Sequence, residues 1–167
     1  MLIYHPAYDV NHGMFRMLRL LDRNPAHQLQ WDTFRILDIY YLFPHLLAAA
    51  TLPRTFTKAK RAFGAQGTKY TRAPAPRIFI QQMSGLHESV AISLVSKGLL
   101  DAEAFKARTL KRTGKPLPPA IEDAFASATG DQNLIDLLAV DLAAIPLSGH
   151  NGLKERTRLL ESYYDAA

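Results

Sequence analysis

The sequence predicts a mostly α-helical protein, a compact helical domain with a winged-helix-like lobe. Two observations predict this class: apolar residues recur at helical spacing along most of the chain, and the segments between them are short and rich in Gly and Pro. The composition, with 48% apolar and 21% charged residues over 167 positions, is typical of a globular protein with a substantial core. We therefore expect one compact domain over residues 1–167.

The most apolar stretch, residues 31–47, is predicted to contain the central helix of the fold. Its apolar side chains cover most of the helical circumference, and Asp32, Arg35 and Asp38 share the remaining arc. We expect Pro44 to end the helix, because proline lacks an amide hydrogen and disfavours helical backbone in the residue before it. The three polar residues stand three apart, which predicts surface pairs between Arg35 and the carboxylates on either side.

Amphipathic helices are predicted on both sides of this central helix. Residues 12–22 place methionines and leucines on one face with arginines between them, and Asp9 or Asn11 is the expected N-cap. After the central helix we expect a second helical piece that ends before Pro53. Residues 55–64 then form a basic amphipathic helix.

The middle of the chain suggests two lobes within the domain. Residues 65–76 are rich in Gly, Thr and Pro and are expected to form an exposed connection. Residues 1–64 and 118–167 would build the helical core, and residues 77–117 the winged-helix-like lobe. In that lobe a helix, a turn at Gly85 and a second helix follow one another, which is the order of a helix-turn-helix.

The expected second helix of this lobe lacks the side chains for reading DNA sequence. It exposes Glu88, Ser89 and Lys97 but has no arginine or asparagine placed for bidentate contact with a base. Residues 113–115 are the predicted tip of the wing. We therefore expect no sequence-specific DNA recognition.

Three further helices are predicted after residue 117. Residues 118–129 form the first of them, and Asp131 is expected to cap the second, residues 132–144, which should pack on the central helix. Residues 148–152 contain two glycines and are expected to form a tight loop. Residues 153–164 are the last predicted helix.

Positive charge is concentrated in one window of the chain. The chain has 20 Lys and Arg residues, and the window between Ile39 and His87 contains several of them but no Asp or Glu. They are Arg54, Lys58, Lys60, Arg61, Lys69, Arg72 and Arg77. Such a patch attracts phosphate backbones or an acidic protein surface, and the alternative is a solvated face that keeps the chain soluble.

No pattern of catalytic residues is present. The sequence has no Gly-rich phosphate-binding loop, and its 6 histidines are scattered singly. Ser148 and His150 are close in sequence, but a catalytic triad needs groups that converge in space beside an oxyanion hole. A metal site at His5, Asp9 and His12 is less expected than a turn followed by a helix cap. We therefore predict no enzyme activity, no cofactor and no metal.

The sequence favours a cytoplasmic location. It has 0 cysteines, which fits a reducing compartment, and its N-terminus lacks the basic and then apolar pattern of a signal peptide. Its longest apolar run falls short of the ~20 residues that span a bilayer, so no membrane partner is expected.

Three groups of residues carry a resemblance to a known family. They are Tyr4-His5-Pro6-Ala7 with Phe15-Arg16-Met17-Leu18, Arg35-Ile36-Leu37-Asp38 through Leu42-Phe43-Pro44, and Gly149 with Gly152-Leu153-Lys154-Glu155-Arg156-Thr157 through Glu161 and Tyr164-Asp165. In this order they resemble the small middle component of ABC-three-component systems, the group that includes Lamassu-type anti-phage defence. The resemblance extends over nearly the whole chain.

The resemblance implies a non-enzymatic scaffold subunit. Its expected partners are an SMC-like ABC ATPase subunit and an effector nuclease subunit, in a complex that senses foreign DNA. Double-stranded DNA is a further expected ligand, bound without sequence preference by the basic window. The alternative function is a stand-alone winged-helix DNA-binding regulator.

The resemblance also suggests a use for the C-terminal loop and helix. Gly149 and Gly152 would let a neighbouring subunit approach the backbone closely, and Lys154 and Arg156 would dock on its acidic or carbonyl-rich surface. In the alternative, these residues form a cap within the chain, in which Arg156 binds a buried carboxylate such as Asp38.

Overall fold

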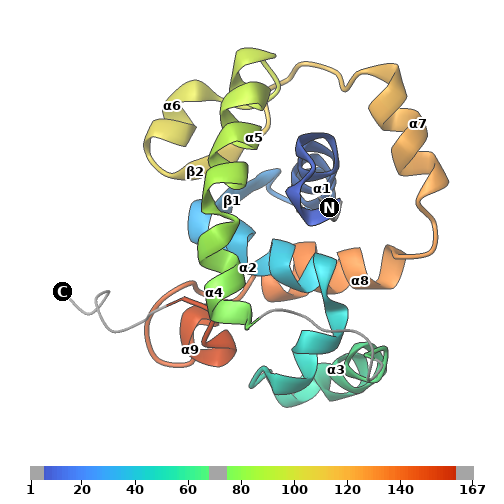
Figure 1. Ribbon diagram of the computed structural model, residues 1–167, viewed down its shortest axis with the longest axis vertical. Coiled ribbons are helices and arrows are strands. Elements are labelled where there is room, and N and C mark those ends of the chain that lie inside the picture. The colour runs from blue at the N-terminus through green and yellow to red at the C-terminus, as the bar shows by residue number, and fades with distance from the viewer. Residues whose placement is uncertain (1–5, 68–74, 161–167) are drawn as a thin grey trace, which may run out of the picture.

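The computed structural model describes residues 6–67 and 75–160 (Figure 1). Its elements are η1 (Pro6–Tyr8), α1 (Val10–Arg23), β1 (Gln28–Gln30), α2 (Trp31–Leu42), η2 (Pro44–Ala49), η3 (Arg54–Phe56), α3 (Thr57–Gly64), α4 (Pro76–Gln82), α5 (Ser84–Ser96), α6 (Ala102–Lys106), β2 (Thr109–Lys111), α7 (Pro119–Ser127), α8 (Gln132–Asp136), η4 (Leu137–Leu142) and α9 (Leu153–Thr157). The predicted mostly α-helical fold is confirmed.

α2 is the central helix that the sequence predicts. Most of its residues are buried, including Trp31 at its start and Tyr40 in its last turn. The helix ends at Leu42, and Pro44 begins the 3₁₀ helix η2, as expected from the missing amide hydrogen of proline. The apolar circumference of α2 is therefore covered by the elements around it.

α1 lies between several other helices, and Figure 1 shows it end-on in the middle of the molecule with α5 to one side and α7 to the other. The Asp9 carboxylate caps α1 by accepting hydrogen bonds from the backbone N–H groups of Asn11 and His12. Gly13 permits the close approach of α5, because a Cβ atom there would lie 2.8 Å from Val90 Cγ2. The core in the described residues extends from Ala7 to Leu160.

A small sheet, which the sequence did not predict, ties two distant segments together. β1 and β2 pair antiparallel with Leu29 opposite Leu110, and both of these side chains are buried. The backbone N–H of Trp31 donates to the carbonyl of Arg108, which extends the pairing to the first residue of α2. The start of the central helix is thus fixed by a segment almost 80 residues further along the chain.

The predicted turn at Gly85 is wrong. The interruption between α4 and α5 lies at Met83, two residues before Gly85, where the Met83 N–H donates to the Phe79 carbonyl and the Met83 carbonyl accepts from the His87 N–H. Gly85 lies inside α5, and Figure 1 shows α4 and α5 as one nearly continuous column. A glycine tolerates helical backbone when the residues on either side favour it, so it did not break this helix.

The predicted wing is also only partly reproduced. Leu100 and Arg112 form an isolated bridge that encloses α6, and residues 113–115 follow this bridge in a segment that leads towards α7. The strand β2 pairs with β1 rather than with a strand after residue 115. The winged-helix-like assignment of residues 77–117 as a whole stays a prediction.

The helix predicted at residues 132–144 forms as α8 and continues into the π-helical segment η4. η4 packs on α2, as expected. A π-helical turn is wider than an α-helical one and changes the pattern of backbone hydrogen bonds. Within this segment the Ala139 carbonyl accepts a hydrogen bond from the side-chain amide of the buried Asn24 at 2.8 Å. Asp131 precedes α8, but its side chain makes no capping hydrogen bond.

The last predicted helix is shorter than expected. α9 ends at Thr157 because Arg158 adopts a left-handed backbone conformation with φ of 56°. The remainder of the expected helix includes residues 161–164, which lie outside the described residues. Within the described residues, no helix is long and apolar enough to span a membrane.

Candidate nucleic-acid and partner interfaces

The predicted basic window forms an exposed ridge on η3 and α3. Arg54, Lys58 and Arg61 are exposed and lie on one side of these helices, because their spacing of four and then three residues matches the helical repeat. Lys60 is half-buried on the neighbouring face. None of the four forms an ion pair with any carboxylate in the described part of the chain. We call Arg54, Lys58 and Arg61 the basic ridge.

The opposite side of α3 attaches the ridge to the body of the protein. Phe56, Ala59 and Phe63 are partly buried and pack against the core, and α3 lies along η2. The apolar face therefore positions the helix and leaves its cations in solvent.

The remaining predicted cations do not extend this ridge in the described structure. Lys69 and Arg72 lie outside the described residues. Arg77 is exposed in the first turn of α4, which Figure 1 shows apart from α3. The seven predicted residues therefore do not all share one described surface.

The predicted C-terminal interface loop is tied to its own chain. Gly149 has φ of 89°, and a Cβ atom at Gly152 would lie 2.6 Å from the Ser148 carbonyl oxygen, so both positions require glycine. Arg156 closes the loop by donating from Nε to the Asn151 carbonyl at 2.6 Å and from Nη1 to the Thr51 carbonyl at 2.9 Å. The backbone N–H of Thr51 donates in return to the Arg156 carbonyl.

Lys154 is likewise engaged inside the molecule. It is 7% exposed, and its Nζ lies 3.4 Å from Asp32 Oδ2, near the first turn of α2. In the alternative of a cap within the chain, Arg156 was expected to bind the Asp38 carboxylate. That partner is wrong, because Arg156 binds backbone carbonyls instead. Docking of this loop on another subunit stays a prediction.

The Asp38 carboxylate is instead the centre of a buried ion cluster. Arg16 Nε lies 2.6 Å from Asp38 Oδ1, and Arg16 Nη2 lies 3.1 Å from Asp38 Oδ2. His87 Nε2 donates to Asp38 Oδ2 at 2.9 Å. All three side chains are at most 3% exposed, and they join α1, α2 and α5.

The surroundings of this cluster are apolar. The rings of Trp31 and Phe34 pack edge-on against His87, with centroid distances of 6.4 and 5.1 Å. Burial by itself raises the pKa of Asp38, but the hydrogen bond from His87 and the charge and hydrogen bonds of Arg16 outweigh it and hold the pKa below its ordinary value. The carboxylate therefore stays ionised in the interior.

The expected surface pairing around Arg35 is half right. Arg35 Nη1 lies 3.2 Å from Asp32 Oδ1, as the three-residue spacing predicts. Asp38, which was expected on the same exposed arc, is buried and belongs to the cluster with Arg16 and His87. The signal that sequence reasoning missed is an aspartate with apolar residues on both sides of it, Leu37 and Ile39, in a mostly buried helix, where a carboxylate needs a buried cation.

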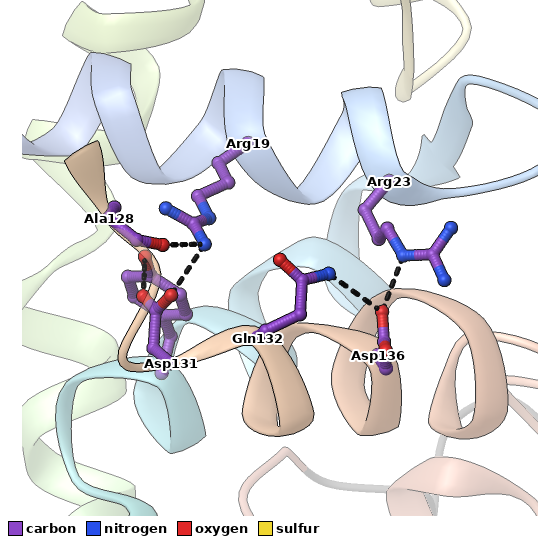
Figure 2. Close-up of polar contacts among 7 residues, drawn as sticks. Arg19, Arg23, Ala128, Asp131, Gln132 and Asp136 are labelled. Carbon is purple, nitrogen blue, oxygen red and sulfur yellow. Dashed lines mark hydrogen bonds and ion pairs between the residues drawn. The ribbon is translucent and has the colours of Figure 1, made fainter. Parts of the chain in front are cut away.

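A second set of ion pairs holds α1 against the segment that leads into α8 (Figure 2). Arg19 Nη2 lies 2.5 Å from Asp131 Oδ1 and also donates to the Ala128 carbonyl at 2.7 Å. The Tyr41 hydroxyl donates to the other oxygen of Asp131 at 2.8 Å. Asp131 is thus used for these contacts, which explains why it makes no capping bond to α8.

Towards the end of α1, Arg23 pairs with Asp136, and the Gln132 side-chain amide also donates to Asp136 Oδ1 at 3.2 Å (Figure 2). Both partners of this pair are well exposed. Among residues 6–67 and 75–160, no group of three or more His, Asp or Glu side chains is placed to hold a metal ion.

In the comparison with known proteins, one family model matches nearly the whole chain. The family model described as ABC-three component (ABC-3C) system Middle Component 5 matches residues 2–165. No curated protein and no solved structure matches.

Proposed function

This chain belongs to the middle components of ABC-three-component systems, and from that premise we propose that it acts as a non-enzymatic scaffold subunit of an anti-phage defence complex of the Lamassu type. It joins an SMC-like ABC ATPase to an effector nuclease. The observation that carries this proposal is the match of the middle-component family model to residues 2–165, because membership implies that the chain works together with the other components of its system.

The arrangement of charge supports a binding role for the surface rather than a chemical role for the interior. Asp38 is bound by Arg16 and His87, and Asp131 is bound by Arg19 and Tyr41, so these buried or half-buried carboxylates serve contacts between helices. A general acid or base would have to reach a substrate, whereas Asp38 is 0% exposed.

The basic ridge supports contact with the DNA backbone. Arg54, Lys58 and Arg61 present three cations on one side of η3 and α3, without a carboxylate partner in the described residues. Phosphate contacts of this kind give binding that is independent of sequence and weakens steeply with salt. The ridge would therefore hold DNA that the ATPase component has engaged.

Co-purification of the three components tests the scaffold role. The ATPase and effector components are expressed together with and without this chain, and one of them carries the affinity tag. The scaffold proposal expects the untagged component to be recovered only when this chain is present. Equal recovery without the chain would show that the two partners need no bridge.

A salt titration of DNA binding tests the ridge. A variant with Arg54→Gln, Lys58→Gln and Arg61→Gln is compared with the unchanged chain on double-stranded DNA of random sequence. Each lost phosphate contact should reduce the slope of log K against log salt by roughly 0.9, so the variant should lose a slope of up to about 3. Equal slopes, or a single DNA sequence bound far above the others, would contradict this use of the ridge.

A further inference from the structure

A polar hollow lies beside the first turn of the central helix α2. It has a volume of about 450 Å³, and residues of α2, α5 and the segment that enters β2 line it. Its polar walls include Arg35 of α2, Ser84 of α5, and Arg108 and Thr109 where β2 begins. We call it the α2 hollow.

The charges around the α2 hollow leave an excess of one positive charge. The Asp32 carboxylate, which also lines the hollow, is shared between two cations, with Arg35 Nη1 3.2 Å from its Oδ1 and Lys154 Nζ 3.4 Å from its Oδ2. Arg108 Nη2 lies 2.8 Å from Glu88 Oε1. Three cations therefore meet two carboxylates, which favours a ligand with negative charge.

The guanidinium group of Arg35 is only partly paired by the chain. Its Nη1 donates to Asp32 and its Nη2 to the Ile80 carbonyl, both at the long distance of 3.2 Å. Its Nε is buried and has no hydrogen-bond partner among the described residues, although the whole side chain is only 12% exposed. Buried N–H groups without an acceptor are uncommon in folded proteins, and a ligand oxygen in the hollow would supply one.

Arg108 is held at the edge of the hollow in a fixed position. Its guanidinium carbon lies 4.6 Å from the centre of the Trp31 ring, and its carbonyl accepts a hydrogen bond from the Trp31 backbone N–H. Its side chain is nevertheless 51% exposed, so its remaining N–H groups are open to a ligand. The ring beneath it and the pair with Glu88 reduce the conformational entropy that binding would cost.

Further donors surround the same space. α2 has 12 residues, and its N-cap residue Gln30 makes no side-chain capping bond, so the positive end of the helix faces the hollow without a cap. The hydroxyl groups of Ser84 and Thr109 are half-buried and form no hydrogen bond with another described residue. Two guanidinium groups and two hydroxyl groups from different elements thus line one hollow.

We propose that the α2 hollow binds the phosphate group of a small molecule. A phosphate group presents three acceptor oxygens in different directions, which matches donors that come from several sides, whereas a carboxylate presents two oxygens in one plane. The volume of the hollow leaves room for the body of the ligand beside its phosphate. This binding adds a ligand to the chain and involves no bond that is made or broken.

The single tryptophan of the chain provides a direct probe. Trp31 is the only tryptophan in the sequence, and it lines the hollow, so its fluorescence reports on this site. Inorganic phosphate is titrated into the full chain while sodium chloride keeps the ionic strength constant, and acetate is titrated in the same way. We expect a saturable change in emission with phosphate and none with acetate over the same concentrations.

Two variants test the donors, and one serves as the control. Arg108→Gln should raise the dissociation constant for phosphate at least about tenfold, because a charged donor is lost, and Ser84→Ala should raise it severalfold. Arg23→Gln should change it less than about twofold. It is a matched control, because Arg23 and its carboxylate partner are 48% and 38% exposed, close to the 51% and 36% of Arg108 and Glu88.

Isothermal titration calorimetry gives the same constants without relying on emission, since loss of the cation above Trp31 alters the fluorescence of Arg108→Gln itself. Thermal unfolding shows which variants are folded. Ser84→Ala keeps the test valid if Arg108→Gln is unstable, because the Ser84 hydroxyl binds no other described residue and alanine favours a helix. Absence of saturable phosphate binding to the unchanged chain, or equal constants for it and the folded variants, would overturn the phosphate site. Saturation by acetate at the same concentrations would overturn the assignment to phosphate.

Discussion

Arg16 in α1 and Arg61 in α3 both lie on amphipathic helices, yet Arg16 is 3% exposed and Arg61 is exposed to solvent. The charge of Arg16 is matched by Asp38 at 2.6 Å, whereas Arg61 meets no carboxylate among the described residues. A buried charge must be compensated within the chain, and it fixes the helices that carry the partners. An exposed charge contributes little to folding and remains available to a ligand.

The largest effect is expected from Asp38→Asn. This substitution keeps the shape of the side chain but leaves the Arg16 guanidinium buried without a counter-charge. The free energy of unfolding should fall by roughly 3–5 kcal/mol, measured by urea denaturation followed by circular dichroism. Asp136→Asn is the control, because Asp136 also pairs with an arginine of α1, but both partners are well exposed. If both variants lost the same stability, burial would not distinguish the two regions.

Part of the same stability should disappear in acid. The pKa of Asp38 is lowered in the folded protein, because the hydrogen bond from His87 and the interactions with Arg16 outweigh the effect of burial. The unfolded chain therefore takes up the proton first, and the contribution of Asp38 is complete above the ordinary value of 3.8 and is lost as the pH falls below it towards the lowered value.

Urea midpoints measured between neutral pH and about pH 3 would show this loss. The Asp38→Asn variant should have a flatter profile over the acid range than the unchanged chain, since it lacks the titrating group. Parallel profiles for the two proteins would mean that other carboxylates account for the acid sensitivity.

A smaller effect is expected from Arg156→Ala. The variant loses the hydrogen bonds to the Asn151 and Thr51 carbonyls, and bonds from a charged donor contribute about 1.5–3 kcal/mol each at most. Because Arg156 is half-exposed, we expect a total loss of about 1.5 kcal/mol, seen as a lower unfolding midpoint. An unchanged midpoint with loss of the partners would instead identify this loop as an interface.

The smallest effect on folding is expected from the ridge variant with Arg54→Gln, Lys58→Gln and Arg61→Gln. Its free energy of unfolding should stay within about 0.5 kcal/mol of the unchanged chain, because the three side chains are exposed. Urea denaturation of the same samples used for DNA binding provides the comparison. A loss as large as that of Asp38→Asn would remove the distinction between buried and exposed charge.

Features set by local sequence were predicted well. The apolar periodicity and Pro44 gave the position of α2, Asp9 was a named candidate for the cap of α1, and the alternation of apolar and basic residues gave α3. Each of these depends on residues within one or two turns of one another. The likeness to ABC-three-component middle components also appeared at this level, because it rests on short stretches in order along the chain.

Features set by contacts between distant segments were missed or misplaced. Asp38 was expected at the surface because its spacing matches Arg35, whereas its partners are 22 and 49 residues away along the chain. β1 and β2 are three residues long and give no periodic signal, and their pairing depends on the packing of Leu29 and Leu110. Gly85 was expected to break a helix whose neighbours and core contacts keep it helical.

We propose that this chain holds other subunits together and performs no reaction itself. The most direct test measures ATP hydrolysis and DNA cleavage over time by the purified chain alone, beside the complex assembled from all three components. We predict that the chain alone shows neither activity and that the assembled complex shows both. ATP turnover or DNA cleavage by the isolated chain, removed by a substitution in that chain, would contradict the claim.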